Sequence, residues 1–408
     1  MDFQTNEDAA AAPLAGARSD KPSVLLLIVG TEGYGMRRVW QALIRGLAAR
    51  GWTVEIAVLM ADKADLWKDL APGIATFSPP LAVAIENLKG GGLGKAMSML
   101  KRATLQLKLS RWLLSVVRAR KTRLIILQTP AETVMAALVA RLSGARAFWM
   151  MPNTVSGNYP LDLNRRIYRF LFRRCNLTPL PNSHYTAGTL GEGTFERPVV
   201  HLGVDPDYFA PDAGETLSRA ELGLAGDAIV LGLFARLIPE KGHGVLVEAL
   251  SRLPEPITVL VLGGPLEGDF PASLRRRIAE LGLEDRILFL GPREDVRPYC
   301  RLCDVVLNTR LDPEPFGISV LEGMAMGKPV LAHGLGGPRE TVVDGKTGWL
   351  IDQPTPESFA AGLARMLADR PRWPAMGEAA RQHVCENFSE AAMLDRLEGH
   401  LLAAAAGK

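Results

Sequence analysis

The sequence has few cysteines and no long uninterrupted hydrophobic run. Four cysteines in 408 residues are too few for a disulfide framework, which favours a reducing compartment, the cytoplasm. Cys300 and Cys303 form a lone CxxC pair without a second ligand pair at matching spacing. We therefore interpret them as helix packing, not as a zinc or redox site. No segment reaches the roughly eighteen consecutive apolar residues of a transmembrane helix, so none is expected.

Strong net charge is also missing. A formal net charge of +3 is too small to indicate a nucleic-acid-binding protein. Residues 1–20 are alanine-rich and polar without an apolar stretch, so we expect a disordered tail there and not a signal peptide.

Acidic residues are absent from segment 95–123, where nine Lys and Arg residues alternate with Leu, Met and Trp. This composition is typical of a basic amphipathic interfacial helix, and segment 165–174 repeats it with five arginines. A solvated helix face is the alternative for each segment alone. Together they predict docking on the anionic inner face of the cytoplasmic membrane, where each Lys or Arg contributes roughly 1 kcal/mol.

The hydrophobic pattern predicts two α/β domains, and 48% hydrophobic content suffices for two cores. In the first half, apolar runs indicate buried parallel strands, with a helix at 37–50. The second half begins a new alternation with helices at 243–252 and 271–281. The expected strands are 21–30, 52–60, 124–127, 147–151, 199–203, 228–234, 257–263 and 287–291.

The most informative stretch is 308–330. A buried strand, 304–309, precedes a Pro- and Asp-rich loop that contains Glu314, and a short helix follows from about Gly317 to Gly327. Loops at the carboxyl ends of parallel strands are where open α/β sheets bind ligands. The stretch therefore predicts a binding or catalytic loop.

The chemistry of this loop suits a sugar joined to a phosphate. The amides of Gly317, Ile318 and Ser319 are helix-start donors, which suit an anionic group. Glu314 and Glu322 lie on either side of them and suit sugar hydroxyls. A capped surface helix with two solvated glutamates is the alternative.

Two further pairs of residues are candidates for ligand contact. Arg236 follows strand 228–234 and Lys241 precedes a helix, where two cations can clamp a diphosphate. Gly33 and Gly35, after the first strand, let the backbone approach a ligand closely, although a plain tight turn explains them equally well.

These motifs resemble the C-terminal half of the retaining, GT-B-fold glycosyltransferases of family 4, the glycosyl transferases group 1. The loop with Gly33 and Gly35 extends the resemblance, less strongly, to the first half. The matching pieces occur in the family's order: the interdomain-like segment 203–211, segment 234–242 with Arg236 and Lys241, Glu314 and Glu322 with seven residues between them, 327–332 and 336–350.

The resemblance implies two Rossmann-like parallel-sheet domains that face each other across a cleft. Residues 21–204 would form the acceptor-side domain and 205–389 the nucleotide-sugar-binding domain. A final helix, 390–408, would cross back to the first domain.

The resemblance also implies roles for the candidate residues. Arg236 and Lys241 would hold the donor diphosphate, Glu314 the donor sugar and Glu322 the ribose. The amides from Phe316 to Ser319, namely Phe316, Gly317, Ile318 and Ser319, would reach sugar and phosphate. No metal or other cofactor is expected, because Asp205 and Asp207, which have DxD spacing, are interpreted as a turn.

One position departs from the family pattern. Many relatives carry a histidine on the loop after the strand 147–151, where this chain has Asn153. An amide can hydrogen-bond a donor sugar hydroxyl but cannot act as a base. His184 is the nearest alternative histidine.

The leading hypothesis is a hexosyltransferase-type, retaining glycosyltransferase, cytoplasmic and peripheral on the inner membrane face. It would move a sugar from a nucleotide-diphosphate-sugar to a lipid-linked or polysaccharide glycan acceptor in cell-surface glycan synthesis. A nucleotide-sugar epimerase of the same architecture, and a degenerate, non-catalytic sugar-nucleotide-binding protein, are the alternatives.

Overall fold

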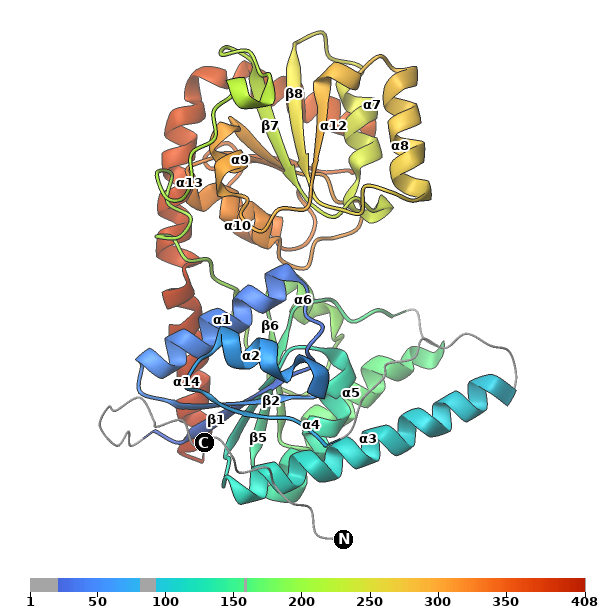
Figure 1. Cartoon of the computed structure of the whole chain (residues 1–408), viewed down its shortest axis with the longest axis vertical. Coiled ribbons are helices and arrows are strands. Elements are labelled where there is room, and N and C mark those ends of the chain that lie inside the picture. Colours follow the sequence, from blue (N-terminus) through green and yellow to red (C-terminus); the bar gives the residue numbers. More distant parts are fainter. Residues whose placement is uncertain (1–20, 81–92, 158–159, 408) are drawn as a thin grey trace. The chain divides into compact units, whose positions relative to one another are not determined.

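The structure, a computed structural model, describes residues 21–80, 93–157 and 160–407 (Figure 1). They form two compact units. The first unit contains the described residues up to Asn182, Ala187–Val200 and the chain from Leu394, and the second contains Ser183–Thr186 and His201–Met393.

The first unit is built on a six-stranded parallel sheet with the strand order β3-β2-β1-β4-β5-β6. Consecutive apolar residues make these strands, as expected for a sheet buried on both faces. The strands are β1 (Ser23–Ile28), β2 (Thr53–Val58), β3 (Ala75–Phe77), β4 (Leu124–Leu127), β5 (Arg146–Met151) and β6 (Leu177–Pro181).

Helices cover the first sheet. One buried cluster joins α3, α4 and α5 to alternate residues of the strands. Elsewhere in the unit α14 packs on α1, where the Leu394 side chain lies directly against Gly46. The helices are α1 (Tyr34–Ala49), α2 (Ala64–Leu70), α3 (Leu93–Ala119), α4 (Pro130–Ser143), α5 (Leu163–Arg174), α6 (His184–Thr189) and α14 (Glu390–Ala405).

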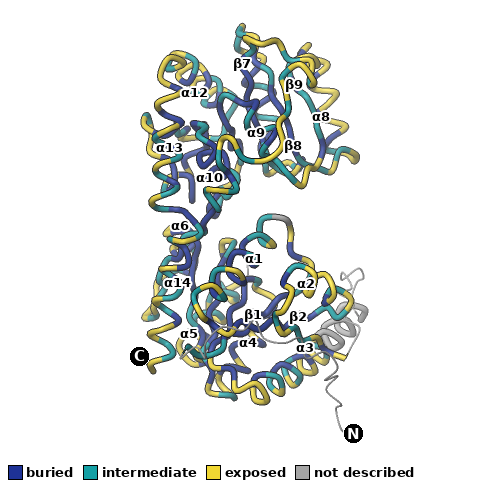
Figure 2. The backbone as a smooth tube through the Cα atoms, turned by 60° about the vertical axis from the view of Figure 1, so that its left-hand side comes forward, coloured by how far each residue is buried: buried dark blue, intermediate teal, exposed yellow. Residues whose placement is uncertain are grey.

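The second unit repeats this architecture with the strand order β12-β11-β10-β7-β8-β9, all parallel. The strands are β7 (Ile229–Phe234), β8 (Ile257–Leu262), β9 (Ile287–Gly291), β10 (Val305–Asn308), β11 (Val330–His333) and β12 (Gly348–Ile351). In both units the strands are the most buried elements, while the helices expose their outer sides (Figure 2).

Two helix layers enclose the second sheet. One core cluster joins α7, α8 and α12 to one face, and another joins α10 and α13 to the other. The helices are α7 (His243–Leu250), α8 (Asp269–Glu280), α9 (Arg297–Leu302), α10 (Ile318–Ala325), α11 (Pro338–Thr341), α12 (Pro356–Ala368) and α13 (Trp373–Asn387). Short 3-10 helices are η1 (Ala61–Lys63), η2 (Pro160–Asp162), η3 (Ala220–Leu222), η4 (Pro239–Lys241), η5 (Glu284–Arg286) and η6 (Arg370–Arg372).

The two parallel sheets confirm the predicted α/β class, and the predicted strands are present with ends that differ by a few residues, except that 199–203 forms no strand. The strand order reverses between β1 and β4 in the first sheet and between β7 and β10 in the second. At such a switch point, loops leave neighbouring strands in opposite directions and open a crevice that binds ligands.

Two smaller expectations concern local structure. Cys300 and Cys303 are buried, and burial raises the pKa of the Cys300 thiol to about 12, which fits the packing role. The Asp205 carboxylate accepts the backbone amides of Asp207 and Tyr208 at 3.0 and 3.1 Å, which makes the predicted turn. In the described part of the chain, no helix is both long and apolar enough to cross a bilayer.

Candidate functional site

The candidate donor site lies in the second unit, at the carboxyl ends of the neighbouring strands β7 and β10. Arg236 follows β7, and Lys241 ends the 3-10 helix η4 just before α7. Glu314 lies in the loop between β10 and α10. The switch point of the second sheet thus brings together two segments that are about seventy residues apart.

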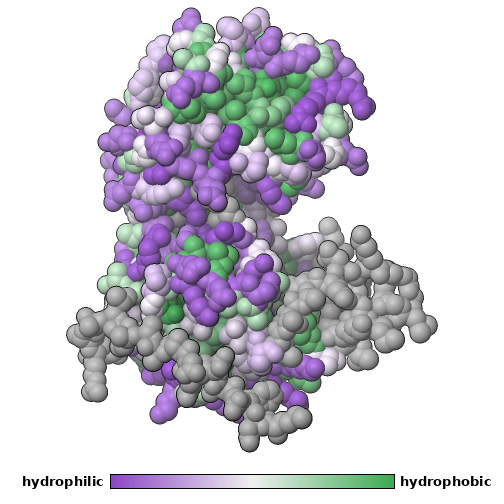
Figure 3. Space-filling model, in the orientation of Figure 1, coloured by the Kyte–Doolittle hydropathy of each residue, from purple (hydrophilic) through white to green (hydrophobic). Residues whose placement is uncertain are grey.

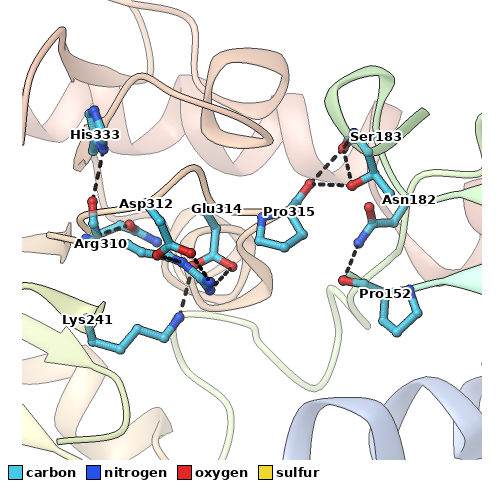
Figure 4. A network of polar contacts seen from close by, with 11 residues as sticks. Pro152, Asn182, Ser183, Lys241, Arg310, Asp312, Glu314, Pro315 and His333 are labelled. Carbon is cyan, nitrogen blue, oxygen red and sulfur yellow. Dashed lines mark hydrogen bonds and ion pairs between the residues drawn. The ribbon is translucent and has the colours of Figure 1, made fainter. Parts of the chain in front are cut away.

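An ion network joins these segments (Figure 4). Lys241 Nζ lies 2.9 Å from Glu314 Oε2, and Arg310 Nη1 lies 3.1 Å from Glu314 Oε1. Arg310 also binds both carboxylate oxygens of Asp312, at 2.7 and 2.9 Å, and this hydrogen bonding lowers the pKa of Asp312. The Glu314 side chain is only 12% exposed and is shared between two cations.

The loop backbone is fixed by a glycine pair in the segment before α11. Gly337 N donates to Glu314 O at 2.7 Å, and Gly336 forms a parallel bridge with Glu314. A Cβ atom on Gly336 would lie 2.1 Å from Glu314 O, and one on Gly337 would lie 2.3 Å from Phe316 Cα. Only glycine allows this approach, so residues 336–337 set the position of the Glu314 backbone.

Helix α10 begins directly after this loop. Gly317 has φ +89° and lies at the helix N-cap, and the first-turn amides of Ile318 and Ser319 have no acceptor within the helix. Such amides, with the positive end of the helix dipole, favour an anionic ligand. Phe316 and Glu322 are buried, so their side chains belong more to the core than to an open surface.

Arg236 is not part of the ion network. Its side chain is exposed, and it forms no ion pair within the ranges that the structure describes. The structure therefore joins Lys241 and Glu314 directly, and leaves the Arg236 guanidinium available for a ligand at the end of β7.

The remaining candidates lie in the first unit. Gly33 is the N-cap of α1, with φ −68°, and a Cβ atom added there would have no neighbour within 4 Å. Neither strain nor packing thus requires glycine at this position. Gly35 is in the first turn of α1, and Asn153 is exposed on the loop after β5.

The sequence did not predict a second group of contacts, which is centred on Glu340 and adjoins the loop of Glu314. The Glu340 carboxylate, in α11, accepts hydrogen bonds from the backbone amides of His184 and Tyr185, each at 2.9 Å, and contacts His201 Nε2 at 3.0 Å. Burial alone would raise the pKa of Glu340, but these hydrogen bonds outweigh it and hold the pKa below its usual value. Motif 336–350 contains Glu340, but nothing in the sequence indicates its partners.

Two contacts join this group to the loop that contains Glu314. The His201 ring stacks on Phe316 with 5.8 Å between ring centroids, and Ser183 Oγ donates to Pro315 O at 2.7 Å. The connector residues 183 and 201, where the chain enters the second unit, are therefore in contact with the segment that follows Glu314.

One set of possible metal ligands occurs in the described part of the chain. Ligand atoms of His184, His201 and Glu340 lie within 4.8 Å of one another. Both Glu340 oxygens, however, are already engaged by backbone amides and the His201 ring. These three residues therefore have a structural role in this conformation, in which the His184 backbone amide donates to Glu340.

Comparison with known sequences supports the assignment of the second unit. The family model described as Glycosyl transferases group 1 matches residues 215–383, which include Arg236, Lys241, Glu314 and Glu322. A GDP-mannose-dependent alpha-(1-6)-phosphatidylinositol monomannoside mannosyltransferase of Mycolicibacterium smegmatis is 35% identical over 198 residues, 46% of this chain and 51% of the relative. A D-inositol 3-phosphate glycosyltransferase of Stackebrandtia nassauensis is 38% identical over 197 residues, 45% of this chain and 44% of the relative. The chain thus spans about half the length of the curated relatives it matches.

Solved structures resemble both units together. A glycosyltransferase from Rickettsia africae superposes with a TM-score of 0.80 at 20% identity, covering 95% of this chain and 100% of the other. Anabaena HepE in complex with UDP-glucose superposes with a TM-score of 0.74 at 22% identity, covering 93% and 99%. At these identities the likeness is one of fold.

Proposed function

We propose that the chain is a glycosyltransferase with a nucleotide-diphosphate-sugar donor, because residues 215–383 match the Glycosyl transferases group 1 family model and the chain has a GT-B fold. The observation that carries the proposal is the Lys241–Glu314–Arg310 network, which lies at the switch point of the second sheet. It combines cations for a diphosphate with a carboxylate for a sugar.

The network explains how the site exchanges partners when a donor binds. Diphosphate oxygens compete with Glu314 for Lys241, since both are anionic oxygen ligands. Glu314 is not left unpaired by this exchange, because Arg310 holds its other oxygen at 3.1 Å. The released Oε2 then accepts a hydrogen bond from a sugar hydroxyl.

The same groups act during bond cleavage. Breaking the glycosidic bond leaves negative charge on the diphosphate, and positive character builds on the anomeric carbon. Lys241, Arg236 and the first amides of α10 are fixed donors for that negative charge, and one well-placed donor is worth roughly 3 kcal/mol. We propose that these donors take the role that a metal has in other enzymes, and that the reaction is metal-independent.

We propose a retaining, front-face reaction, in which the leaving phosphate helps to deprotonate the acceptor. This route needs no enzymic nucleophile and no base on the loop of Asn153. The open side of Gly33 fits the close passage of a ligand past the start of α1. The two curated relatives are named for inositol-containing acceptors, and the basic helices of the first unit support a lipid-linked or polysaccharide acceptor at the cytoplasmic membrane face.

A thermal-shift panel of nucleotide sugars tests the donor site. A donor at a hundred times its Kd stabilises the protein by about 2.7 kcal/mol, which identifies the sugar and base. We expect Glu314→Ala and Lys241→Ala to abolish most of the shift. The exposed Glu378→Ala and Lys346→Ala in the same unit serve as controls and should retain it.

Turnover decides between the functional alternatives. Release of nucleoside diphosphate together with a glycosylated acceptor supports transfer. An altered donor sugar without an acceptor would indicate an epimerase, and tight donor binding without any product would indicate a non-catalytic binding protein.

A further inference from the structure

Helices α3, α4 and α5 form a layer on one face of the sheet in the first unit (Figure 1). α4 packs on both of its neighbours. Leu109, Leu113 and Val117 of α3 are buried in the core beneath this layer. The apolar side of α3 therefore serves the core of its own unit, which differs from the interfacial helix expected for segment 95–123.

The outer side of the layer is unusually apolar in α4 and α5. Val134, Leu138 and Leu142 of α4 are 45%, 44% and 61% exposed and follow one another at helical spacing. Of the thirteen large hydrophobic side chains that are exposed in the described residues, eight are in or next to these three helices. They are Leu107, Val134, Leu138, Leu142, Leu161, Leu163, Ile167 and Phe170.

Cations outnumber acidic side chains around these apolar residues. Over residues 103–120, 130–143 and 161–174 the acidic side chains are Glu132, which is buried, and Asp162, which is already paired with Arg165 and Arg169. None of the exposed cations below has an ion-pair partner in the described part of the chain. They are Lys108, Arg111, Arg118, Arg141, Arg166, Arg173 and Arg174.

These features together define a basic apolar face, consisting of the eight hydrophobic residues and seven cations named above. On the face shown in Figure 3, the largest hydrophobic patch lies on the second unit, so the basic apolar face is identified from the exposed fractions of its side chains. A scattered exposed leucine needs no explanation, but a set concentrated on three adjoining helices indicates an interaction surface.

We propose that this basic apolar face docks on an anionic lipid bilayer, with α4 and α5 supplying the side chains that enter the interface and all three helices the cations. Lys and Arg at headgroup depth around Leu and Phe side chains are the pattern of peripheral membrane binding. An anionic membrane would be the partner of the proposed enzyme. Lipid binding itself needs no catalysis, so the docking surface rests on the proposed function only for its biological role.

A second copy of the chain is a poorer occupant. A symmetric dimer would press the same patch against itself and would bring the seven cations of each copy together, while Asp162 is already paired with Arg165 and Arg169. Anionic phospholipid supplies the missing negative charge.

Vesicle flotation tests the proposal. We expect the wild-type chain to bind vesicles that contain phosphatidylglycerol and not vesicles of phosphatidylcholine alone, with weaker binding at high salt. Replacing Arg141, Arg166 and Arg173 by glutamate should weaken binding at least roughly fivefold per cation. Arg276→Glu, an exposed arginine of the second unit, should have no such effect.

The apolar contribution has a matched control. Leu138 and Leu402 are both 44% exposed, but only Leu138 lies on the basic apolar face. We expect Leu138→Glu to weaken vesicle binding about tenfold and Leu402→Glu to leave it unchanged. Equal effects of these two substitutions, equal binding to neutral and anionic vesicles, or concentration-dependent dimers broken by Leu138→Glu would overturn the proposal.

Failure of membrane binding can be separated from failure of the proposed function. Donor turnover with a water-soluble acceptor, measured without vesicles, should be the same in the wild type and in Leu138→Glu. A chain that turns over donor but ignores anionic vesicles would overturn the docking surface alone.

Discussion

Replacing Lys241 by methionine should separate catalysis from folding. The substitution keeps most of the side-chain volume and removes the charge that lies 2.9 Å from Glu314 Oε2. Loss of one fixed donor to the leaving group costs about 10²–10³ in kcat. We therefore expect a decrease of this size in the rate of nucleoside diphosphate release.

The stability of the same variant should change little. Breaking an ion pair is costly when it leaves a buried charge without a partner, but here Glu314 keeps Arg310 at 3.1 Å. The Lys241 side chain is also 20% exposed. We expect a loss of about 1 kcal/mol in the free energy of unfolding, or about 2–4 °C in Tm for a unit of this size.

Arg310→Met should show the opposite balance, because Arg310 binds both Asp312 and Glu314 and would leave two carboxylates less satisfied. Its loss in Tm should exceed that of Lys241→Met. Unchanged kcat in Lys241→Met would show that Lys241 does not stabilise the leaving group, and a larger loss of Tm in Lys241→Met than in Arg310→Met would show that Arg310 does not hold the two carboxylates. Lys346→Met provides the matched control.

Three further substitutions test other parts of the structure. Glu398 is hydrogen-bonded by Lys21, which lowers its pKa to about 2. Its stabilising effect is present above about pH 4.5 and is lost as the pH falls toward 2, so Glu398→Gln should cost about 1–3 kcal/mol at pH 7 and flatten acid denaturation curves. Burial raises the pKa of Glu132 to about 7. The protonated carboxyl is therefore favoured in the folded state, and its contribution to the free energy of unfolding is lost as the pH rises through 7. Glu132→Gln should stabilise the protein by about 1–3 kcal/mol at pH 8 in urea titrations, and lower stability at that pH would contradict the raised pKa. Gly33→Val should leave Tm within about 2 °C but reduce donor turnover about tenfold, since only a ligand would meet the new side chain; a large loss of Tm would show a packing role instead.

The fold was largely predictable because most of its strands are continuous apolar runs. The run before Gly30 and the run after Ala228 became β1 and β7, both buried on two faces. Strands β3, β6, β11 and β12 were not predicted. In β3, three residues at a sheet edge, partly exposed, carry no periodic signal.

The candidate site was predictable where function depends on local order along the chain. A cation after a strand, and a carboxylate between a strand and a helix start, are visible in the sequence. The partners of Glu314 were not, because Arg310 and the Gly336 bridge depend on tertiary packing. Glu340 and His201 likewise meet across 139 residues.

For the basic helices, the sequence did not predict which apolar side chains stay exposed. A mixture of Leu and Lys or Arg predicts an interfacial helix whether its apolar side faces lipid or a core. In α3, Leu113 is fully buried, whereas Leu138 in the inconspicuous helix α4 is exposed. Which side chain remains on the surface is decided by the neighbouring helices.

We propose that Lys241 and Glu314 form a donor site from which sugar is transferred. The most direct measurement is nucleoside diphosphate release with the stabilising donor, followed together with the mass of the glycosylated acceptor. We predict equal amounts of both products in the wild type, and a loss of both in Glu314→Ala and Lys241→Ala. Wild-type amounts of product from both variants would show that the donor site lies elsewhere.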